Sequence, residues 1–364
     1  MRRNKSFVVV CAFSLFLFAA LAPADKEQTE ALLSEFTPAA QVIASTVPAN
    51  GDQNPYGIAF VPEGFHPGGP LRPNDILVSN FNDSANQQGT GTTIVRITPN
   101  GQQLLFFEAN SNPQSLVGLT TALGALKSGF VLVGNVPTDA SGAVHPGSLL
   151  VVNRFGTLVA TLTSGLDSPW DLAVVDNGVA AQVFVSNVLS GTVTRLDIIA
   201  DVNGNSIQQV RTTQIASGYV HRLDPTALVI GPTGLAYNFS SDTLFVASTG
   251  DNKVFAVANA RSRNTDAGTG RIAYQDDAHL HGPLGLSLAP NGNLIAANGD
   301  AVNPGGTQNA LVEFTRDGVF VSQFQIDPGA AGGAFGIALD REGNVVRFAA
   351  VDDDQNTLNV WNVH

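Results

Sequence analysis

The sequence predicts an all-β protein, a six-bladed β-propeller with four-stranded antiparallel blades. A short motif recurs six times along the chain, and we call it the marker. It consists of a proline or apolar residue, one further residue, and then Gly-Leu, Gly-Ile or a close variant. Its central positions are Gly57, Gly118, Asp171, Gly234, Gly285 and Gly336, with spacings of 61, 53, 63, 51 and 51 residues. Repeats of about this length that carry several short strands each are typical of propeller blades, whereas helical solenoids would show a 3.6-residue period.

The unit at residues 282–327 shows most clearly how strands and turns alternate after a marker. It contains four apolar runs, GLSLA, NLIAAN, ALVEFT and VFVSQFQI, separated by an Asn-Gly turn, a long polar loop and an Asp-Gly turn. Short runs with β-branched and aromatic residues between such turns predict antiparallel strands joined by hairpins. One such meander has two apolar faces, so it needs neighbours of the same kind to bury both.

Corresponding strands are expected in the other units. The second strands are NDILVSN, GFVLVGN, AQVFVSN, DTLFVAS, NLIAAN and NVVRFAA. The third strands are TTIVRITPNG, GSLLVVNRFG, GTVTRLDIIADVNG, NKVFAVAN, ALVEFTRDG and NTLNVWNV. The fourth strands are QQLLFFEA, TLVATLT, SIQQVRTTQIA, RIAYQ (after the longer loop 261–270) and VFVSQFQI.

The sixth unit ends after its third strand, and a spare strand, AQVIAST, precedes the first marker. We therefore expect the N-terminal strand to complete the last blade, which leaves no open sheet edge at the ring closure. A two-domain β-sandwich, the alternative, does not explain one missing and one spare strand. Removal of residues 1–46 should destabilise such a ring, whereas removal of residues 1–36 should leave its melting nearly unchanged.

The N-terminus predicts export. Residues 1–24 have a basic start, an apolar run over 7–22 and small residues at Ala22 and Ala24, which together are typical of a cleaved signal peptide. An uncleaved anchor is the alternative, although 16 residues are short for a membrane-spanning helix. We expect a secreted or periplasmic protein with a tail at 25–38 and a single propeller domain at 39–364.

The charge of the chain limits its partners. The formal net charge is −12, and loss of the predicted signal removes three basic residues and no acidic ones, giving −12 − 3 = −15. It also removes the only cysteine, so no disulfide is expected. Strong acidity argues against nucleic acid and anionic membrane surfaces and is compatible with bound cations. We expect a monomer that does not insert into membranes after signal cleavage.

The repeat, as in Pro55-Tyr56-Gly57-Ile58-Ala59 followed by hairpins such as NDILVSN and TTIVRITPNG, resembles the NHL-repeat group. It also resembles the related gluconolactonase/regucalcin-like (SMP-30) six-bladed propellers and the repeats of streptogramin lyases. The resemblance covers residues 39–364 and lies in the repeat motif. It implies a propeller whose functional site lies on the face where the loops between second and third strands open.

The resemblance also implies specific site positions. Gluconolactonase-like enzymes bind a divalent metal through Glu, Asn and Asp side chains, some of which directly precede the repeat glycine. The matching positions here are Tyr56, Val117, Trp170, Thr233, Leu284 and Phe335, none of which is a carboxylate or an amide. Only Asp171, in place of the glycine itself, is acidic, and the catalytic histidine of the lyases has no counterpart at these positions. The chain therefore departs from both enzyme patterns.

Polar residues at the ends of the second strands form the first candidate ligand site. Asn80, Asn135, Asn187 and Asn298 occupy matching positions. Nearby loop residues add carboxylates: Asp251, Asp300, Asp352 and Asp353. A ring of amides and carboxylates suits Ca²⁺ or sugar hydroxyls. The alternative is structural, because Asn and Asp favour the turns that end strands.

Aromatic residues directly before three of the markers form a second candidate. Tyr56, Trp170 and Phe335 would surround the channel mouth beside Asp171, and aromatic rings beside polar groups suit apolar or sugar-like ligands. Packing between neighbouring blades is the alternative explanation.

The segment 276–281 is a candidate metal site. If it is extended, His279 and His281 project to one side, and Asp277 adds a carboxylate, which together suit Zn²⁺ or Fe²⁺. Solvated loop residues are the alternative. His221 precedes the fourth marker on the same face.

Our first functional hypothesis is a binding or scaffolding module whose partner is a small molecule, a carbohydrate or a protein. It follows from a well-specified framework without a complete catalytic set. The alternative is a divalent-metal-dependent hydrolase or lactonase, in which Ca²⁺ or another divalent cation polarises a carbonyl. A third possibility is a lyase acting on a cyclic ester, with His221, His279 or His281 as its base.

Overall fold

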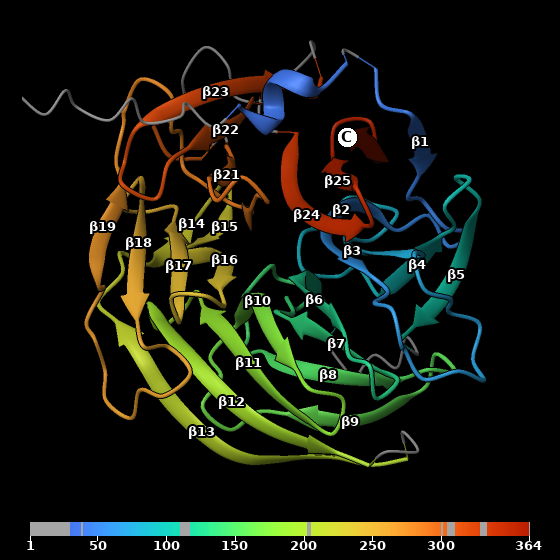
Figure 1. The fold of residues 1–364 in the computed structure, drawn as a ribbon. Helices are drawn as coiled ribbons and strands as arrows, with labels where there is room; N and C mark the ends of the chain where they lie inside the picture. Colours follow the sequence, from blue (N-terminus) through green and yellow to red (C-terminus); the bar gives the residue numbers. More distant parts are fainter. Residues whose placement is uncertain are drawn as a thin grey trace, which may run out of the picture. The chain divides into compact units, whose positions relative to one another are not determined.

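The computed structural model describes residues 30–37, 39–109, 117–201, 205–299, 301–303, 310–327 and 333–363. The predicted signal segment 1–24 and the candidate Asp300 lie outside these residues. Over residues 31–364 the chain forms one compact unit. It is an all-β, six-bladed propeller, as predicted (Figure 1). Within the part of the chain described, no helix has the length and apolar character needed to cross a membrane.

Each blade is a four-stranded antiparallel sheet. Blades one to three are β2 (Gln53–Phe60), β3 (Ile76–Asn82), β4 (Thr93–Ile97) and β5 (Gln103–Glu108); β6 (Leu119–Ala125), β7 (Phe130–Asn135), β8 (Ser148–Asn153) and β9 (Leu158–Leu162); and β10 (Pro169–Asp176), β11 (Ala180–Asn187), β12 (Thr192–Ala200) and β13 (Ile207–Ser217). Blades four and five are β16 (Pro232–Asn238), β17 (Thr243–Ser248), β18 (Lys253–Ala258) and β19 (Arg271–Tyr274); and β20 (Leu286–Leu288), β21 (Leu294–Ala297), β22 (Ala310–Phe314) and β23 (Phe320–Gln325). The expected fourth strand after the loop 261–270 is therefore confirmed as β19.

The sixth blade closes the ring as the strand count predicts. Its sheet order is β1-β26-β25-β24, formed by β24 (Ala334–Glu342), β25 (Val345–Asp352), β26 (Thr357–Val363) and β1 (Val42–Ser45). β1 pairs antiparallel with β26, with Val42 opposite Val360 and Ser45 opposite Thr357. The N-terminal strand is therefore the outer strand of the last blade, beside the C-terminal strand of the chain.

Close packing between blades explains why the repeat marker contains glycine. A Cβ on Gly336 would lie 2.0 Å from the Tyr56 carbonyl oxygen, and one on Gly285 would lie 2.4 Å from that of Phe335. The same holds for Gly234, at 2.4 Å from the Leu284 carbonyl oxygen. The innermost strands of blades four and five, five and six, and six and one therefore pass in backbone contact at the marker, and a side chain at these three glycines would separate them.

The segment predicted as a tail, 25–38, is not loose over residues 31–37. The short 3₁₀ helix η1 (Leu32–Glu35) buries Leu32 and Leu33, and Phe36 is also buried. The Phe36 ring stacks on Trp361 with 5.2 Å between centroids, and the Trp361 indole N–H donates to the Thr37 carbonyl oxygen at 3.1 Å. The propeller domain therefore begins before residue 39 and includes this apolar segment.

A small hairpin between blades three and four was not predicted. It consists of β14 (Arg222–Asp224) and β15 (Leu228–Ile230), with a tip at Thr226. The Gln88 side-chain amide of blade one donates to the Thr226 carbonyl oxygen at 3.2 Å. Leu228 has a φ of 63°, a conformation that is rare for a bulky residue. The hairpin therefore reaches the loops of a blade that is not its neighbour in sequence.

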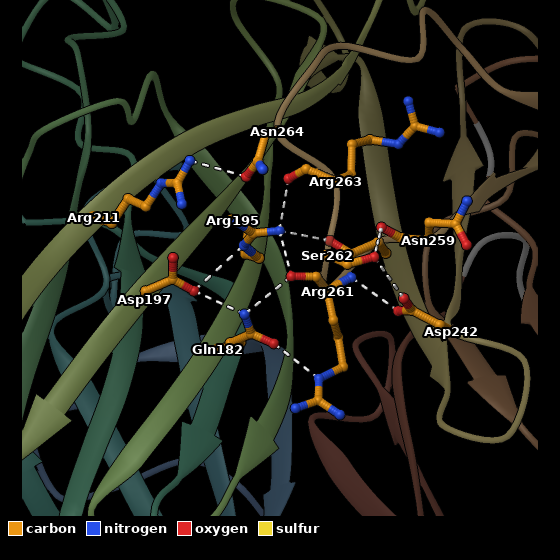
Figure 2. A network of polar contacts seen from close by, with 11 residues as sticks. Gln182, Arg195, Asp197, Arg211, Asp242, Asn259, Arg261, Ser262, Arg263 and Asn264 are labelled. Carbon is orange, nitrogen blue, oxygen red and sulfur yellow. Dashed lines mark hydrogen bonds and ion pairs between the residues drawn. The ribbon is translucent and has the colours of Figure 1, made fainter.

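A buried arginine joins blades three and four (Figure 2). Arg195 on β12 is 2% exposed, and its Nη1 lies 3.0, 2.6 and 2.9 Å from the carbonyl oxygens of Ala260, Arg261 and Arg263 in the turn after β18. Asp197 lies 3.4 Å from Arg195 Nε, so the guanidinium has a carboxylate partner as well. One side chain of blade three thus satisfies three carbonyl groups of blade four.

Candidate ligand site at the mouth of the channel

A cavity of about 110 Å³ lies where the inner strands meet the loops between second and third strands. Its walls come from the marker positions, from these loops and from the tip of the β14–β15 hairpin. The lining residues are Asn54, Tyr56, Gln88, Trp170, Thr226, Ala227, Val229, Ile230, Thr233, Thr249, Gly282, Leu284, Gly299, Ala301, Phe335 and Asp353. We name it the mouth cavity.

The aromatic residues predicted at the mouth do come together. Tyr56 stacks on Phe335 at 4.4 Å and on Phe81 at 4.6 Å between ring centroids. Trp170 meets Tyr56 edge-on at 5.9 Å. Tyr56 and Trp170 are only 5% and 4% exposed, so most of their surface packs between blades and the remainder forms one wall of the mouth cavity. The packing explanation considered from the sequence therefore applies, and the ligand-binding one stays a prediction.

The polar groups of the mouth cavity are mainly hydrogen-bond acceptors. The hydroxyls of Thr233 and Thr249 both donate to the Pro283 carbonyl oxygen, at 2.9 and 2.8 Å, so their lone pairs remain for other donors. The buried Oδ1 of Asn54 has no hydrogen-bond partner in the described structure, and Asp353 adds a carboxylate. Because buried acceptors normally have partners, this set of groups favours a ligand that donates hydrogen bonds.

The predicted ring of asparagines has a structural role. The side-chain oxygens of Asn135, Asn187 and Asn298 accept the backbone N–H groups of residues that enter the first strand of their own blade. These donors are Gly118 at 2.8 Å, Asp167 at 3.0 Å and His281 at 2.9 Å. Asn80 donates to the carbonyl oxygen of Thr46 at 3.0 Å. None of the four asparagines lines the mouth cavity.

In blade four, a serine and an aspartate together replace the asparagine that holds the entering segment in other blades. Asp251 accepts the Ser248 hydroxyl at 2.7 Å and the Val220 N–H at 3.0 Å. Ser248 occupies the position that asparagine holds in blades one and three. It pairs with Pro232, as Asn80 pairs with Pro55 and Asn187 with Pro169. The carboxylate of Asp251 is thus engaged in holding the entry to blade four.

Blade six differs, because Asp352 stands at the asparagine position. Its carboxylate joins those of Asp327 and Asp354, and one oxygen from each lies within 4.8 Å of the others. Burial and, to a smaller extent, the nearby carboxylates of Asp327 and Asp354 raise the pKa of Asp352 to about 6. A hydrogen bond from the Gln355 N–H acts in the opposite direction. We name these three residues the acidic cluster. Asp352 was a sequence candidate, but Asp327 was not.

Asp171 bridges two blades instead of lining the mouth cavity. Its Oδ2 accepts the Leu235 N–H of blade four at 2.8 Å, and its Oδ1 accepts the Leu172 N–H at 2.8 Å. Burial raises the pKa of this carboxyl to about 7, although the two N–H groups act in the opposite direction. The residue that replaces the marker glycine therefore carries a buried carboxyl with a raised pKa.

Within the described residues, His279, His281 and Asp277 do not come together as a group of three potential metal ligands. The segment turns instead of extending, since the N–H of Leu280 donates to the Asp276 carbonyl oxygen at 2.8 Å. His279 consequently pairs with Asp276 at 2.6 Å. His281 Nδ1 lies 2.7 Å from the Asn303 carbonyl oxygen, and Asp277 accepts the Asn252 amide at 3.0 Å.

The other histidine considered from the sequence is also engaged elsewhere. His221 Nδ1 lies 2.9 Å from the Tyr219 carbonyl oxygen, and the residue is exposed. Among the described residues, the acidic cluster is the one group of three or more potential metal-ligating side chains. The metal candidates therefore shift from the histidine segment to blade six.

Comparisons with known proteins match the fold. No family profile matches the chain, and no curated protein matches its sequence. A calcium-binding protein, regucalcin, from Agrobacterium tumefaciens superposes with a TM-score of 0.51 at 13% identity, over 88% of this chain and 94% of that one. A putative oxidoreductase (glucose dehydrogenase) from Thermus thermophilus gives 0.52 at 13% identity, over 87% and 99%. A gluconolactonase from Xanthomonas campestris gives 0.48 at 16% identity, over 86% and 87%. At these identities the likeness to the regucalcin and to the glucose dehydrogenase-like protein concerns the fold alone, a six-bladed propeller as the sequence repeat suggested.

Proposed function

We propose that the chain binds a small, hydroxyl-bearing ligand in the mouth cavity. The observation that carries this proposal is the combination, in one lining, of an aromatic wall with acceptor groups on Asn54, Thr233, Thr249 and Asp353. A sugar or a cyclic polyol has both an apolar ring face and several O–H donors, so it fits this combination.

The size of the mouth cavity limits the ligand. Its volume of about 110 Å³ is somewhat below the roughly 150 Å³ of an engineered protein cavity that holds benzene. One five- or six-membered ring, or one such ring of a longer molecule, is therefore the largest group expected inside. A whole protein domain is excluded as the occupant of the mouth cavity, although a protruding side chain is not.

Filling the mouth cavity should abolish binding. Ala227 lies at the hairpin tip and lines the cavity, so Ala227→Phe would occupy the space without changing a blade strand. We expect saturable binding of at least one member of a panel of neutral monosaccharides and cyclic polyols, followed by ligand-observed NMR and Trp170 fluorescence, and at least about tenfold weaker binding by the variant. Ala143→Phe, at an exposed loop position, is the matched control. If no panel member binds the unmodified protein, or if A227F binds as well as A143F, the proposal is wrong.

The second candidate function is a divalent-cation-dependent hydrolase of the lactonase type. Support for it comes from the acidic cluster and from the propeller fold shared with a protein named as calcium-binding. Ca²⁺–oxygen distances of about 2.3–2.6 Å place two ligand oxygens of one ion up to roughly 5 Å apart, so oxygens within 4.8 Å of one another fit. A bound ion would act as a Lewis acid on an ester carbonyl. Asp353, between two members of the cluster, lines the mouth cavity.

Replacing the Asp352 carboxylate should abolish cation binding without lowering the stability of the cation-free protein. Asp352→Asn introduces the side chain found at the matching positions of blades one, two, three and five. We expect Ca²⁺ to raise the Tm of the unmodified protein and EDTA to reverse this, because a ligand that binds only the folded state stabilises it. The D352N variant should lose this response and, without Ca²⁺, melt at the same or a higher temperature, since one repulsive charge is gone. An identical Ca²⁺ response in D352N would remove the hydrolase candidate.

A further inference from the structure

A second cavity lies on the opposite face of the propeller, at the turns that end the first strands of blades four, five and six. Its volume is about 570 Å³. The lining residues are Asn238, Ser240, Leu288, Ala289, Pro290, Gly292, Arg316, Leu339, Asp340 and Arg341. None of them lines the mouth cavity, so the two cavities are separate. We name this one the arginine cavity.

Two arginines from different blades meet at the arginine cavity. Arg316 lies in the turn between β22 and β23, half-buried, and its Nη2 lies 3.4 Å from the position of a Cβ on Gly292. Within the described residues, the Arg316 guanidinium forms no hydrogen bond or ion pair. Arg341 at the end of β24 is exposed and uses only its Nε, which donates to the Gly343 carbonyl oxygen at 3.1 Å. Most of the N–H donors of both side chains are therefore available.

The neighbouring polar groups add a donor and no free negative charge. Asn238 Oδ1 accepts three hydrogen bonds, from the N–H and hydroxyl of Ser240 and from the Ser241 N–H. This fixes the orientation of the amide and leaves its Nδ2 group as a further donor. Asp340, the one carboxylate of the lining, is ion-paired with Arg347. The lining consequently presents more positive charge and more donors than acceptors.

We propose that the arginine cavity binds a small anion that carries a carboxylate or a phosphate. Guanidinium groups bind both anions through paired, charge-assisted hydrogen bonds. In a chain with a formal net charge of −12, most of the surface repels anions, so two guanidiniums at one concave site mark a local exception. The Ser240 hydroxyl suits a ligand that also carries hydroxyl groups. This inference does not depend on the proposed function of the mouth cavity.

The test uses two probes, inorganic phosphate and D-glucuronate, titrated into the intact protein at constant ionic strength and followed by calorimetry and by NMR. We expect saturable one-to-one binding of at least one probe, which also tells whether a phosphate or a carboxylate is preferred. The R316Q/R341Q double variant should bind at least about tenfold more weakly. Arg316 lies in a turn and Arg341 is an exposed residue near the end of β24, and neither side chain belongs to the buried core, so the variant should keep the Tm of the unmodified protein.

The control is Arg271→Gln on β19, which removes the same charge from an exposed position outside the arginine cavity. R271Q should bind within about twofold of the unmodified protein, because Arg271 does not line the arginine cavity and its exposed charge is screened by salt. The single variants R316Q and R341Q should each fall between R271Q and the double variant. Non-saturating titrations with both probes, or an equal loss in R271Q and in R316Q/R341Q, would overturn the proposal.

Discussion

A chain that begins at residue 47 is expected to show no cooperative melting transition. The truncation removes β1, which is the outer strand of blade six, and leaves β26 as an open sheet edge. It also removes four buried apolar side chains: Leu32, Leu33, Phe36 and Ala44. Loss of a buried Leu or Phe costs about 2–5 kcal/mol each. Three such losses and one strand reach or exceed the 5–15 kcal/mol that is typical of whole-protein stability.

Two shorter truncations test which part of the N-terminus matters. A chain that begins at residue 31 keeps every N-terminal contact described for the domain and should melt like the full chain. A chain that begins at residue 38 lacks η1 and the Phe36–Trp361 stack, and it leaves Glu313 without the Leu33 N–H that donates to it at 2.9 Å. We expect this chain to melt at a clearly lower temperature, measured by circular dichroism and calorimetry. Equal melting of the chains that begin at 31 and at 47 would contradict the ring closure.

From the sequence alone, loss of the segment before residue 37 is expected to leave the melting temperature nearly unchanged. The structure predicts a lower melting temperature, because this segment makes contacts with residues far away in the sequence. Leu32, Leu33 and Phe36 are three apolar residues with neither a strand alternation nor a helical repeat of useful length. Their burial depends on Trp361 and on the acceptor Glu313, which lie about 280 to 330 residues away in sequence. A contact of that kind leaves no mark in a local pattern, so the segment was predicted as a tail.

The blades, by contrast, were predictable because each strand is signalled by its immediate neighbours. Asn-Gly and Asp-Gly turns determine the hairpins, and the marker glycines record the contact between inner strands. Even the closing strand follows from a count. The candidate site was predicted less well: the matching asparagines were found, but an amide at a strand end has the same sequence whether it binds a ligand or holds a loop.

The acidic cluster shows the same limit. Asp352 and Asp354 are close in sequence, but Asp327 follows the fourth strand of blade five. Only the placement of blade five beside blade six brings its carboxylate to the other two. Likewise, the β14–β15 hairpin carries no repeat signal, although its tip and β15 supply four residues to the mouth cavity. Both features arise from the way the blades are placed in the ring, so the sequence of a single repeat does not indicate them.

Replacement of Arg195 by methionine is expected to cost about 3–5 kcal/mol of unfolding free energy, the range for removing one partner of a buried ionic interaction. Methionine keeps much of the apolar volume of the side chain, so the loss arises from the polar groups. The carbonyl oxygens of Ala260, Arg261 and Arg263 lose a donor that lies within 3.0 Å of each. Urea denaturation measures the change, through a lower midpoint at an unchanged m-value.

Two further variants distinguish the geometry of the guanidinium from its charge. Arg195→Lys keeps the charge but presents a single ammonium, which does not reproduce the planar set of donors, so an intermediate loss is expected. Arg211→Met is the matched control. Arg211 is exposed, on the next strand, and donates to Asn264 of the same turn at 2.9 Å, and loss of an exposed contact should cost less than about 1 kcal/mol.

Hydrogen exchange then tests whether Arg195 acts between the blades. If the guanidinium holds the turn 259–264 of blade four against β12 of blade three, R195M should lose amide protection in that turn first, because the Ser262 and Arg263 N–H groups bond to Asn259 within it. Protection in the distant blades one and six should fall only with global stability. A uniform loss of protection across all six blades, or a cost in R195M no larger than in R211M, would show that Arg195 is an ordinary core residue. The turn would then be held by Asp242, whose carboxylate accepts the Arg261 N–H at 2.9 Å from within the same blade.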